Sequence, residues 1–580
     1  MTALNQSPIP LGEGSNLSAS TLLTDNLSLL AGAPNGIKKL RELILELAVR
    51  GKLVPQYFSD EPASELLKRI AEEKARLLAE GKIKKQKPLA EIAEEEKPFE
   101  LPSGWQWIRL AKGVIKLTDG EHLSPPKAPS GIPLLTAKDV TDSGVMFENT
   151  QFVTVENGLK YRERCNPDRG DILICSRGTI GRCAAVETDQ VFCLMGSVIL
   201  VKLSVSTFYR YMLRYLQTPL AQQWMLGASS ATAVSALYLK DVANCVVPLP
   251  PLAEQHRIVA KVDELMALCD QLEVQQADAE SAHAQLVQAL LDSLTQTSNA
   301  TGFAANWQRL SEHFHTLFIT EASIDALKQT LLQLAVMGKL VPQDPSDEPV
   351  SELLRRVWEI NDKLERTLSS GAGGNDAERW FGISVPDGWS ICKVSNIAEV
   401  KLGSTPSRAE SSYWSGDIPW VSSGEVAGTI IESTREKITL AGHKNSSTTM
   451  IPPGSVLIAM IGQGKTRGQS ALLEIEACTN QNVAALIFNI DLIASRYVWL
   501  WAQAMYSLHR AGGHGGAQPA LNAKKVKAFS LPLPPTAEQL RIVAKVDQLM
   551  ALCDQLKTRL AQTRQLNEQL TSTLVERALA

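Results

Sequence analysis

The sequence has few of the residues that form metal centres or disulfide frameworks. Its nine cysteines, among 580 residues, include no CxxC pair and no cysteine with a histidine close by. This spacing argues against a zinc site and against the disulfide framework of a small secreted protein. We therefore expect reduced thiols and no bound metal.

Long apolar runs are also missing. No stretch of 18 apolar residues is present, and the start of the chain lacks the basic and then apolar pattern of a signal peptide. The composition, 44% hydrophobic and 21% charged, is that of an ordinary soluble protein. We expect a cytoplasmic protein of about three to five folding units, with no membrane segment.

The chain has little excess charge as a whole, with a net charge of −4, but the charge is unevenly distributed. Residues 101–250 and 385–535 each carry +3, and the rest of the chain carries −10. Phosphate binding requires local positive potential rather than a basic protein. Two mildly basic segments in an acidic frame are a weak indication of nucleic-acid binding.

Internal duplication is the most informative feature of the sequence. The segment EQHRIVAKVDELMALCDQL at 254–272 returns at 538–556 with 17 of 19 positions identical. LAVRGKLVPQ at 47–56 returns as LAVMGKLVPQ at 334–343, and VPLPP at 247–251 returns as LPLPP at 531–535. Near-identical blocks thus surround two segments of about 150 residues that are much less alike.

The two variable segments share a pattern of short strands. GIPLLTAKDV at 131–140 corresponds to DIPWVSSGEV at 417–426, and GDILICSRGTIG at 170–181 corresponds to GSVLIAMIGQGK at 454–465. These apolar, β-branched runs bounded by Gly or Pro predict strands that end in loops, while 209–218 and 496–505 have a helical pattern. Each variable segment is predicted to be a small mixed α+β domain.

The near-identical blocks predict long helices, because neither Pro nor Gly interrupts residues 253–297 or 537–580. Apolar residues recur there at alternating steps of four and three, as in a coiled coil. We expect shorter helices at 37–50 and 324–337, and charged stretches at 63–80 and 350–367, to pack alongside. The predicted seam comprises Ile258, Val262, Leu265, Cys269 and Leu272 in the first copy and Ile542, Val546, Leu549, Cys553 and Leu556 in the second.

Each helix has only one narrow apolar stripe and needs a partner. The simplest partner is the other long helix, packed antiparallel, which predicts a pseudo-twofold, circular internal repeat with the chain termini close together. Two unrelated coiled-coil tails that bind other proteins are the alternative. Polar Gln276 and His283 fall on the first seam, where they would set the register.

The repeated block PLPPLAEQHRIVAKVDELM and PLPPTAEQLRIVAKVDQLM resembles the conserved-region signature of the specificity subunit of type I restriction–modification enzymes. GSTPSR at 403–408, YWSGDIPWVSSGEV at 413–426 and LNAKKVKAFSLPLPP at 521–535 resemble that family's target recognition domains. The resemblance implies an α+β protein with two globular mixed α/β target recognition domains separated by two long antiparallel coiled-coil helices. The expected division is an N-terminal tail (1–35), a helical region (36–100), the first recognition domain (101–252), a central region with the helix 253–297 (253–384), the second recognition domain (385–535) and a C-terminal helix (536–580).

The same resemblance implies a non-catalytic DNA-binding subunit. It would hold two methyltransferase subunits and, with two restriction subunits, form an ATP-dependent endonuclease. Each recognition domain would bind one half of a split asymmetric site in double-stranded DNA. This chain would bind no cofactor itself, whereas the complex would use S-adenosylmethionine, ATP and Mg²⁺. A coiled-coil scaffold without a DNA role is the alternative function.

The residues suggest no catalytic centre in this chain. Ala459, Gly464, Lys465 and Thr466 fit a relaxed phosphate-loop pattern, which would make the chain a nucleotide hydrolase. The first position is Ala rather than Gly, and the corresponding GTIGR at 178–182 lacks the lysine. A basic turn facing DNA is the better interpretation. NPD at 166–168 lacks the Pro-Pro-aromatic stretch of an adenine methyltransferase.

We expect DNA contacts from loops that close the shared strands, because Arg and Lys bind guanine edges or phosphates and Gln or Asn pairs with adenine. For any one of these residues, a solvated surface position is at least as common. The candidates are Lys138, Arg177, Thr179 and Arg182 in the first domain, and Ser404, Thr405, Arg408, Ser422, Lys465, Arg467, Gln481, Asn482, Lys524 and Lys525 in the second.

Overall fold

The computed structural model describes residues 27–84, 88–229, 235–297, 300–366, 368, 385–462, 465–511 and 520–579. Residues 1–26 of the predicted tail, and Gly464 of the phosphate-loop pattern, lie outside these described residues. The chain forms two compact units, residues 1–278 with 564–580 and residues 279–563. Each unit contains one variable domain and a group of helices that we call its frame.

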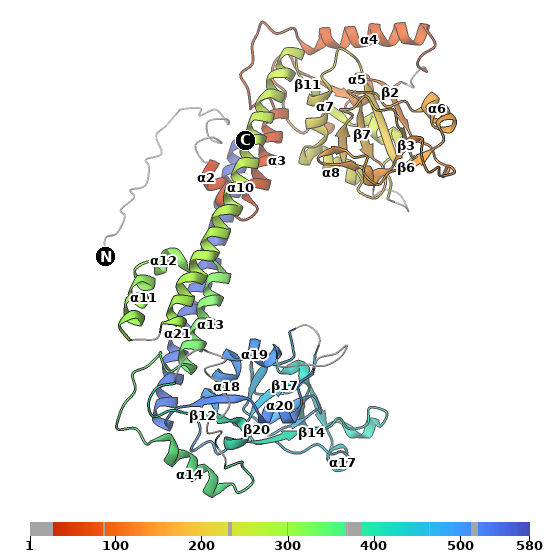
Figure 1. Cartoon of the computed structure of the whole chain (residues 1–580). Helices are drawn as coiled ribbons and strands as arrows, with labels where there is room; N and C mark the ends of the chain where they lie inside the picture. The colour runs from red at the N-terminus through yellow and green to blue at the C-terminus, as the bar shows by residue number, and fades with distance from the viewer. Residues whose placement is uncertain are drawn as a thin grey trace. The chain divides into compact units, whose positions relative to one another are not determined.

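The two frames repeat each other. Both long helices contribute to both frames: α10 (Leu252–Gln296) begins in the first unit and ends in the second, and α21 (Thr536–Leu579) does the reverse. The expected long helices and the shorter helices near 37–50 and 324–337 are confirmed (Figure 1). The charged stretches are helical too, but the expectation that they pack along the long helices is wrong for the first, because Ala63, Leu66 and Ile70 are buried in the core of the first variable domain. The shorter frame helices are α2 (Leu27–Gly32), α3 (Gly36–Val49) and α4 (Ala63–Ala79) in the first unit, and α11 (Ala300–Glu312), α12 (Phe314–Leu317), α13 (Glu321–Val336) and α14 (Val350–Ile360) in the second.

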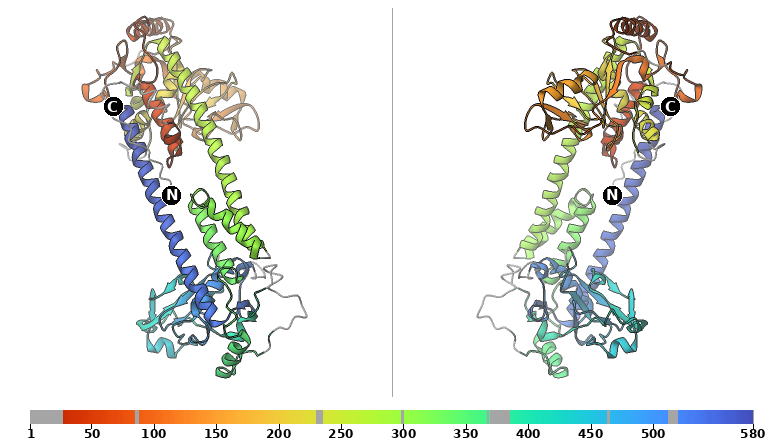
Figure 2. Two further views of the ribbon diagram at one scale, coloured as in Figure 1. Left: turned by 90° about the vertical axis from the view of Figure 1, so that its left-hand side faces the viewer. Right: turned by 90° about the vertical axis from the view of Figure 1, so that its right-hand side faces the viewer.

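The predicted seam of α10 is buried within the first frame. Ile258, Val262, Leu265 and Cys269 are buried and Leu272 is half-buried, all in one apolar cluster with α3 and the end of α21. This end of α21 (blue) lies near α3 (red) in Figures 1 and 2. The cluster also includes the first and last parts of the described chain, α2 and the end of α21, so the predicted proximity of the termini is confirmed for them.

The seam of α21 is divided between two clusters of the second unit. Ile542 and Val546 are buried in a core that joins α13 to the variable domain. Leu549, Cys553 and Leu556 pack with α13 and the end of α10. In each unit the beginning of one long helix thus lies with the end of the other, so the two helices are antiparallel.

The middle of each long helix, unlike its ends, is not buried. No residue of α10 is buried between Leu272 and Val287, and none of α21 between Cys553 and Thr571. The polar seam residues fall in this stretch, Gln276 exposed and His283 half-buried. Apolar packing therefore stabilises the ends of the two helices, where the short frame helices lie.

Variable domain 1 runs from β1 to β11 and is built on a four-stranded antiparallel sheet in the order β2-β10-β7-β8, beside a three-stranded sheet β6-β3-β9. Its first and last strands, β1 and β11, pair with each other and close the domain. Its strands and helices are β1 (Gln106–Arg109), α5 (Leu110–Gly113), β2 (Val114–Asp119), β3 (Ile132–Leu135), β4 (Val140–Thr141), β5 (Gly144–Val145), β6 (Gln151–Val153), α6 (Val155–Arg164), β7 (Ile172–Cys175), β8 (Cys183–Ala185), β9 (Cys193–Leu194), β10 (Val198–Leu203), α7 (Tyr209–Leu216), α8 (Pro219–Ser229), α9 (Leu239–Asn244) and β11 (Val246–Leu249).

Variable domain 2 runs from β12 to β21 and repeats this plan. A five-stranded sheet β13-β20-β17-β18-β15 lies beside the three-stranded sheet β16-β14-β19, and β12 pairs with β21. Its strands and helices are β12 (Ser390–Lys393), α16 (Val394–Ile397), β13 (Glu399–Leu402), β14 (Trp414–Val421), β15 (Ile430–Ile431), β16 (Glu436–Ile438), α17 (Leu440–Lys444), β17 (Val456–Ala459), β18 (Ser470–Leu473), β19 (Cys478–Thr479), β20 (Val483–Ile487), α18 (Ser495–Ala504), α19 (Tyr506–Ala511), α20 (Ala523–Lys527) and β21 (Ser530–Leu533).

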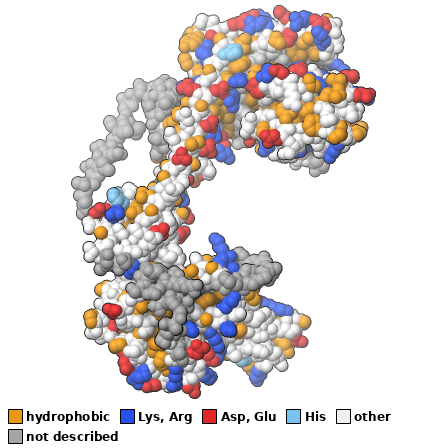
Figure 3. Space-filling model, in the orientation of Figure 1, with side chains coloured by type: hydrophobic (Ala, Val, Ile, Leu, Met, Phe, Trp, Pro, Cys, Tyr) orange, Lys and Arg blue, Asp and Glu red, His pale blue; other side chains and the backbone are white. Residues whose placement is uncertain are grey.

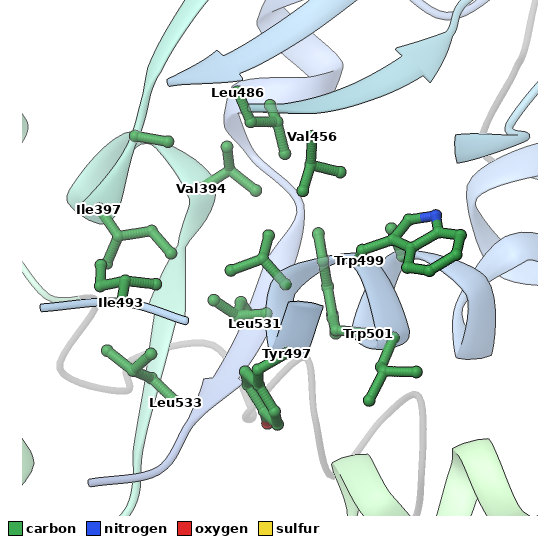
Figure 4. Packing of buried hydrophobic residues seen from close by; sticks show 14 of the residues in the cluster. Val394, Ile397, Val456, Leu486, Ile493, Tyr497, Trp499, Trp501, Leu531 and Leu533 are labelled. Carbon is green, nitrogen blue, oxygen red and sulfur yellow. The ribbon is translucent and has the colours of Figure 1, made fainter. Parts of the chain in front are cut away.

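The core of variable domain 2 lies between α18 and the strands. Buried Tyr497 and Trp501 of α18 lie close to Leu531 of β21, with Val456 and Leu486 of the large sheet nearby (Figure 4). The hydroxyl of Tyr497 donates to the Pro532 carbonyl oxygen at 2.6 Å, and the indole of Trp501 donates to the Ser530 carbonyl oxygen at 3.1 Å. Both aromatic residues thus bury a large apolar surface while satisfying their polar atoms.

A tryptophan–glutamate contact is repeated where each variable domain meets its frame, and we call this contact the joint. In the first unit the indole of Trp105 donates to Glu254 of α10 at 2.9 Å, and in the second Trp389 donates to Glu538 of α21 at 2.9 Å. Both tryptophans are buried. Burial raises the pKa of both carboxyl groups, and the hydrogen bond from the indole partly offsets it.

Candidate nucleic-acid interface

One end of each variable domain gathers the loops that follow its strands. Since β2 and β7 are both antiparallel to β10, their C-terminal ends meet at the start of β10. The same holds for β13 and β17, which meet at the start of β20. We call these ends the loop ends; they comprise residues 119–123, 176–177, 195–197 and 236–240 in domain 1 and 402–405, 460–461, 480–482 and 520–524 in domain 2.

The same backbone hydrogen bonds hold both loop ends together, which aligns their positions one by one. Leu237 N donates to Ser176 O at 2.9 Å, as Leu521 N donates to Met460 O at 3.0 Å. Two further pairs correspond at the loop ends: Ser176 N to Ser197 O with Met460 N to Asn482 O, and Glu121 N to Leu194 O with Ser404 N to Thr479 O. The match extends to the opposite end of the sheet, where Gly170 N to Val186 O corresponds to Gly454 N to Leu473 O. Equivalent backbones therefore present different side chains.

The loop end of domain 1 contains a pocket of about 520 Å³. Its apolar wall is formed by Ile199, Ala236 and Leu237, and its polar side chains come from three separate segments of the chain. The polar side chains are Asp119, His122, Ser176, Arg177, Tyr238 and Lys240. Within the part of the chain that the structure describes, neither Arg177 nor Lys240 forms an ion pair, so both cations are available to an anionic ligand.

The predicted residues of domain 1 are divided between two places. Arg177 lines the pocket at the loop end, whereas Thr179 and Arg182 line a second pocket, of about 470 Å³, together with Arg41 of α3. Arg182 lies 3.9 Å from Asp142, and exposed Lys138 donates a long hydrogen bond of 3.4 Å to the Asn149 carbonyl oxygen. The structure therefore does not bring the four predicted residues together.

In domain 2 the structure does bring several predicted residues together. The hydroxyl of Thr405 donates to Gln481 Oε1 at 2.6 Å, with Ser404 and Asn482 adjacent in the chain. Ser422 lies elsewhere, where its hydroxyl donates to Glu425 at 2.8 Å. These contacts place Thr405 and Gln481 side by side on the surface of the loop end.

Arg408 is held from three sides. Its guanidinium forms a bidentate pair with Glu436, and it lies 3.7 Å from the ring centroid of Trp414 and 5.2 Å from that of Trp420. The carboxylate raises the pKa of this already basic group. Arg408 is thus rigid and partly neutralised, unlike Arg177 in domain 1.

The lysines of domain 2 lie on turns and on a short helix. Lys465 and Lys524 are exposed, Arg467 and Lys525 are half-buried, and Lys524 and Lys525 belong to α20. In the view of Figure 3, Lys and Arg side chains lie on both variable domains with Asp and Glu among them. The basic character of these surfaces is therefore local.

The phosphate-loop alternative does not fit the fold. A strand, β17, ends at Ala459 as the pattern requires, but the segment after Lys465 turns into strand β18 rather than into a helix. A phosphate loop depends on the amide groups at a helix N-terminus. The described residues 460–462 and 465–469 therefore connect two strands, β17 and β18, and do not lead into a helix.

Sequence reasoning missed part of the loop end of domain 1. His122, Asp119, Arg164, Tyr238 and Lys240 were not predicted. A signal was present for the last, because Lys240 and Lys524 each precede the PLPP segment of their copy by eight residues, at Pro248 and Pro532. The sequences around Glu121 and Ser404 are not similar, so these two residues can be recognised as equivalent only from their matching backbone hydrogen bonds.

The His, Cys, Asp and Glu side chains of the described residues form no group of three or more that could hold a metal ion. No helix that the structure describes is long and apolar enough to cross a membrane.

Comparison with known proteins gives consistent matches. The family described as "Type I restriction modification DNA specificity domain" matches residues 102–279 and 386–565. The specificity subunits of the type I restriction enzymes EcoAI and EcoEI of Escherichia coli are each 36% identical to this chain, with 94% of both chains covered. The solved HsdS subunit from Thermoanaerobacter tengcongensis is 18% identical, with a TM-score of 0.44 over 83% of this chain and 98% of that one.

Proposed function

Because the chain belongs to the family of type I restriction–modification DNA specificity subunits, we propose that it selects the DNA sequence on which such a complex acts. Each variable domain binds one half of a bipartite, asymmetric site in double-stranded DNA. The chain serves as the specificity subunit and carries no catalytic activity of its own. The scaffold alternative gains no support from these comparisons.

One observation carries this proposal: two copies of a single domain plan present different side chains on equivalent backbones. At the loop ends the hydrogen-bonded pairs correspond, yet His122 stands where the second domain has Thr405, and Arg177 where it has Ile461. A protein that binds one ligand twice has no need of this difference. Two different half-sites account for it, because base sequence is discriminated by side chains at the groove.

The complex supplies the chemistry around this chain. We propose two methyltransferase subunits held by the repeated frames, which methylate adenine with S-adenosylmethionine, and two restriction subunits that cleave DNA with ATP and Mg²⁺. The repetition of the near-identical sequence blocks in the two frames supports two methyltransferase subunits, because a similar partner surface is then presented twice. Because the complex would act on chromosomal DNA, we propose that it works in the cytoplasm.

Exchange of one variable domain tests the proposal. The chain is co-expressed with the methyltransferase of its own system, and methylated motifs are mapped by single-molecule sequencing of the host chromosome. We expect a single bipartite motif. Replacing residues 101–252 with the matching segment of the EcoAI specificity subunit is expected to change the first half of that motif only. A change in both halves, or the absence of any defined motif, would contradict the proposal.

A further inference from the structure

The loop ends show which positions repeat and which differ between the variable domains. Lys240 on α9 and Lys524 on α20 are equivalent and identical. Arg177 is equivalent to Ile461, and the pair His122 and Gly196 is equivalent to Thr405 and Gln481. Phosphates are the same in every half-site, whereas bases are not. Loop-end positions whose backbones are equivalent but whose side chains differ between the two domains are therefore the ones suited to base recognition.

Positions 122 and 196 are sterically coupled. A Cβ atom added to Gly196 would lie 2.7 Å from His122 Nδ1, so the imidazole ring occupies the space that a side chain at 196 would need. In domain 2 the equivalent position carries Gln481, and its partner is the smaller Thr405, which donates to it at 2.6 Å. Each domain thus fills the same site with a different pair.

The imidazole of His122 is held in place by two charged neighbours. Its Nε2 lies 3.1 Å from Asp119 Oδ2 and 3.3 Å from Arg164 Nη2, and Arg164 is itself paired with Asp119. The side chain nevertheless remains 57% exposed. A surface residue fixed in this way presents its ring in one orientation, which is what recognition of a base edge requires.

Arg177 and Arg408 differ in whether the guanidinium is available to a ligand. Arg177 is exposed in the pocket and forms no ion pair within the described residues, whereas the bidentate contact of Arg408 with Glu436 occupies its guanidinium. An unpaired guanidinium matches the two acceptors, O6 and N7, that guanine presents in the major groove. The apolar wall of Ile199, Ala236 and Leu237 excludes water from one side of the pocket.

We propose that Arg177 and the coupled pair His122 and Gly196 determine the bases recognised by variable domain 1, with Arg177 contacting a guanine of that half-site. This inference rests on the proposed function and names the residues that carry it out. Domain 2 uses Thr405 and Gln481 at the equivalent place for its own half-site.

Motif mapping of point variants tests the assignment. Arg177→Gln is expected to lower methylation of the original motif by roughly 10- to 100-fold and to relax or change one guanine position in the first half, because one bidentate base contact is lost. The double variant His122→Thr with Gly196→Gln installs the pair of domain 2 and is expected to alter an adjacent position of the same half. The second half stays unchanged in both variants.

Lys112→Gln is the matched control. Lys112 is exposed and precedes β2, so it lies at the end of that strand opposite the pocket, and its replacement removes the same unit of charge. This variant is expected to methylate the original motif at the original rate. An equal loss for Lys112→Gln and Arg177→Gln would assign the effect to overall charge and overturn the inference.

Further outcomes separate the inference from the function on which it rests. An unchanged motif and rate in Arg177→Gln and in the double variant would reject the assignment while the wild-type motif upholds the proposed function. The absence of a motif in the wild-type complex would reject the function itself. Assembly of each variant is checked by gel filtration; if Arg177→Gln fails to assemble, the double variant and Arg177→Lys decide by the same criterion.

Discussion

The joints and the loop ends of the two variable domains follow opposite rules. At the joints the contacts are duplicated, with Trp105 bound to Glu254 and Trp389 bound to Glu538 at the same distance of 2.9 Å. At the loop ends the backbone is duplicated but the side chains are not, as His122 and Thr405 illustrate. The internal repeat thus has a constant part, the joint, and a variable part, the side chains of the loop end.

This difference separates two physical requirements. A buried joint must keep each domain in a fixed orientation on its helix, and loss of the indole takes a hydrogen-bond donor away from a buried carboxyl group. Exposed loop residues can change at little cost in stability, provided that the hydrogen bonds between their backbones remain. At the loop ends the side chains can therefore differ in ways that alter binding, while the backbone that supports them is kept.

The largest expected effect is the loss of a joint. Trp105→Ala and Trp389→Ala are each expected to lower the free energy of unfolding by about 3–5 kcal/mol, because each removes a buried aromatic side chain and the indole donor of a buried carboxyl group. The two losses should agree within about 1 kcal/mol if the joints are equivalent. Urea denaturation followed by circular dichroism measures both.

Glu254→Gln sharpens the same comparison, since Gln keeps the oxygen that accepts from Trp105 and removes the charge that burial disfavours. We expect a loss below about 1 kcal/mol for this variant and for Glu538→Gln. A large loss in only one of the two units would show that the joints are not equivalent, whatever their geometry.

The frames could be predicted from the sequence to a large extent, and the loop ends could not. Periodicity within one helix locates the seam residues Ile258 and Val262, and both are buried. Their packing against α3, and that of Ile542 and Val546 against α13, depends on how several helices meet and cannot be predicted from the apolar stripe of one helix. The local sequence thus predicts which residues of a helix are buried better than it predicts which helix they pack against.

At the loop ends the prediction depended on which loops meet in space. Arg177 and Thr179 are two residues apart in the chain, but they line different pockets because the turn between β7 and β8 points them to different sides. Conversely, His122 and Lys240 are far apart in the sequence and line one pocket. The pairing of β2 and β7 with β10 produces this arrangement, and long-range strand pairing leaves no local signal.

A buried histidine distinguishes the cores of the two variable domains. His509 of α19 is stacked on Phe529 with ring centroids 4.0 Å apart, and burial lowers its pKa from about 6.5 to about 3. Helix α8 of domain 1 instead contributes Met225 to its core. Only domain 2 should therefore lose stability in mild acid through this group.

The direction of the effect follows from the two protonation equilibria. Below pH 6.5 the unfolded chain takes up a proton at His509 while the folded chain does not, so stability falls as the pH falls toward 3. At pH 4.5 the expected loss is roughly 3 kcal/mol relative to pH 7.5. His509→Met is expected to remove this part of the pH dependence in urea denaturation, and an unchanged dependence would contradict the assignment.

The smallest expected effect concerns the lysines that the two loop ends share. If Lys240 and Lys524 contact phosphates, Lys240→Gln and Lys524→Gln should each reduce the slope of log K against log salt concentration by about one, and leave the methylated motif unchanged. Binding of the methyltransferase complex to a fluorescent duplex carrying its motif, between 50 and 200 mM salt, measures the slope. The shared lysines would then differ in kind from Arg177, whose replacement changes the motif. A motif changed by Lys240→Gln alone would instead place Lys240 among the base-reading residues and remove the distinction between repeated and differing positions.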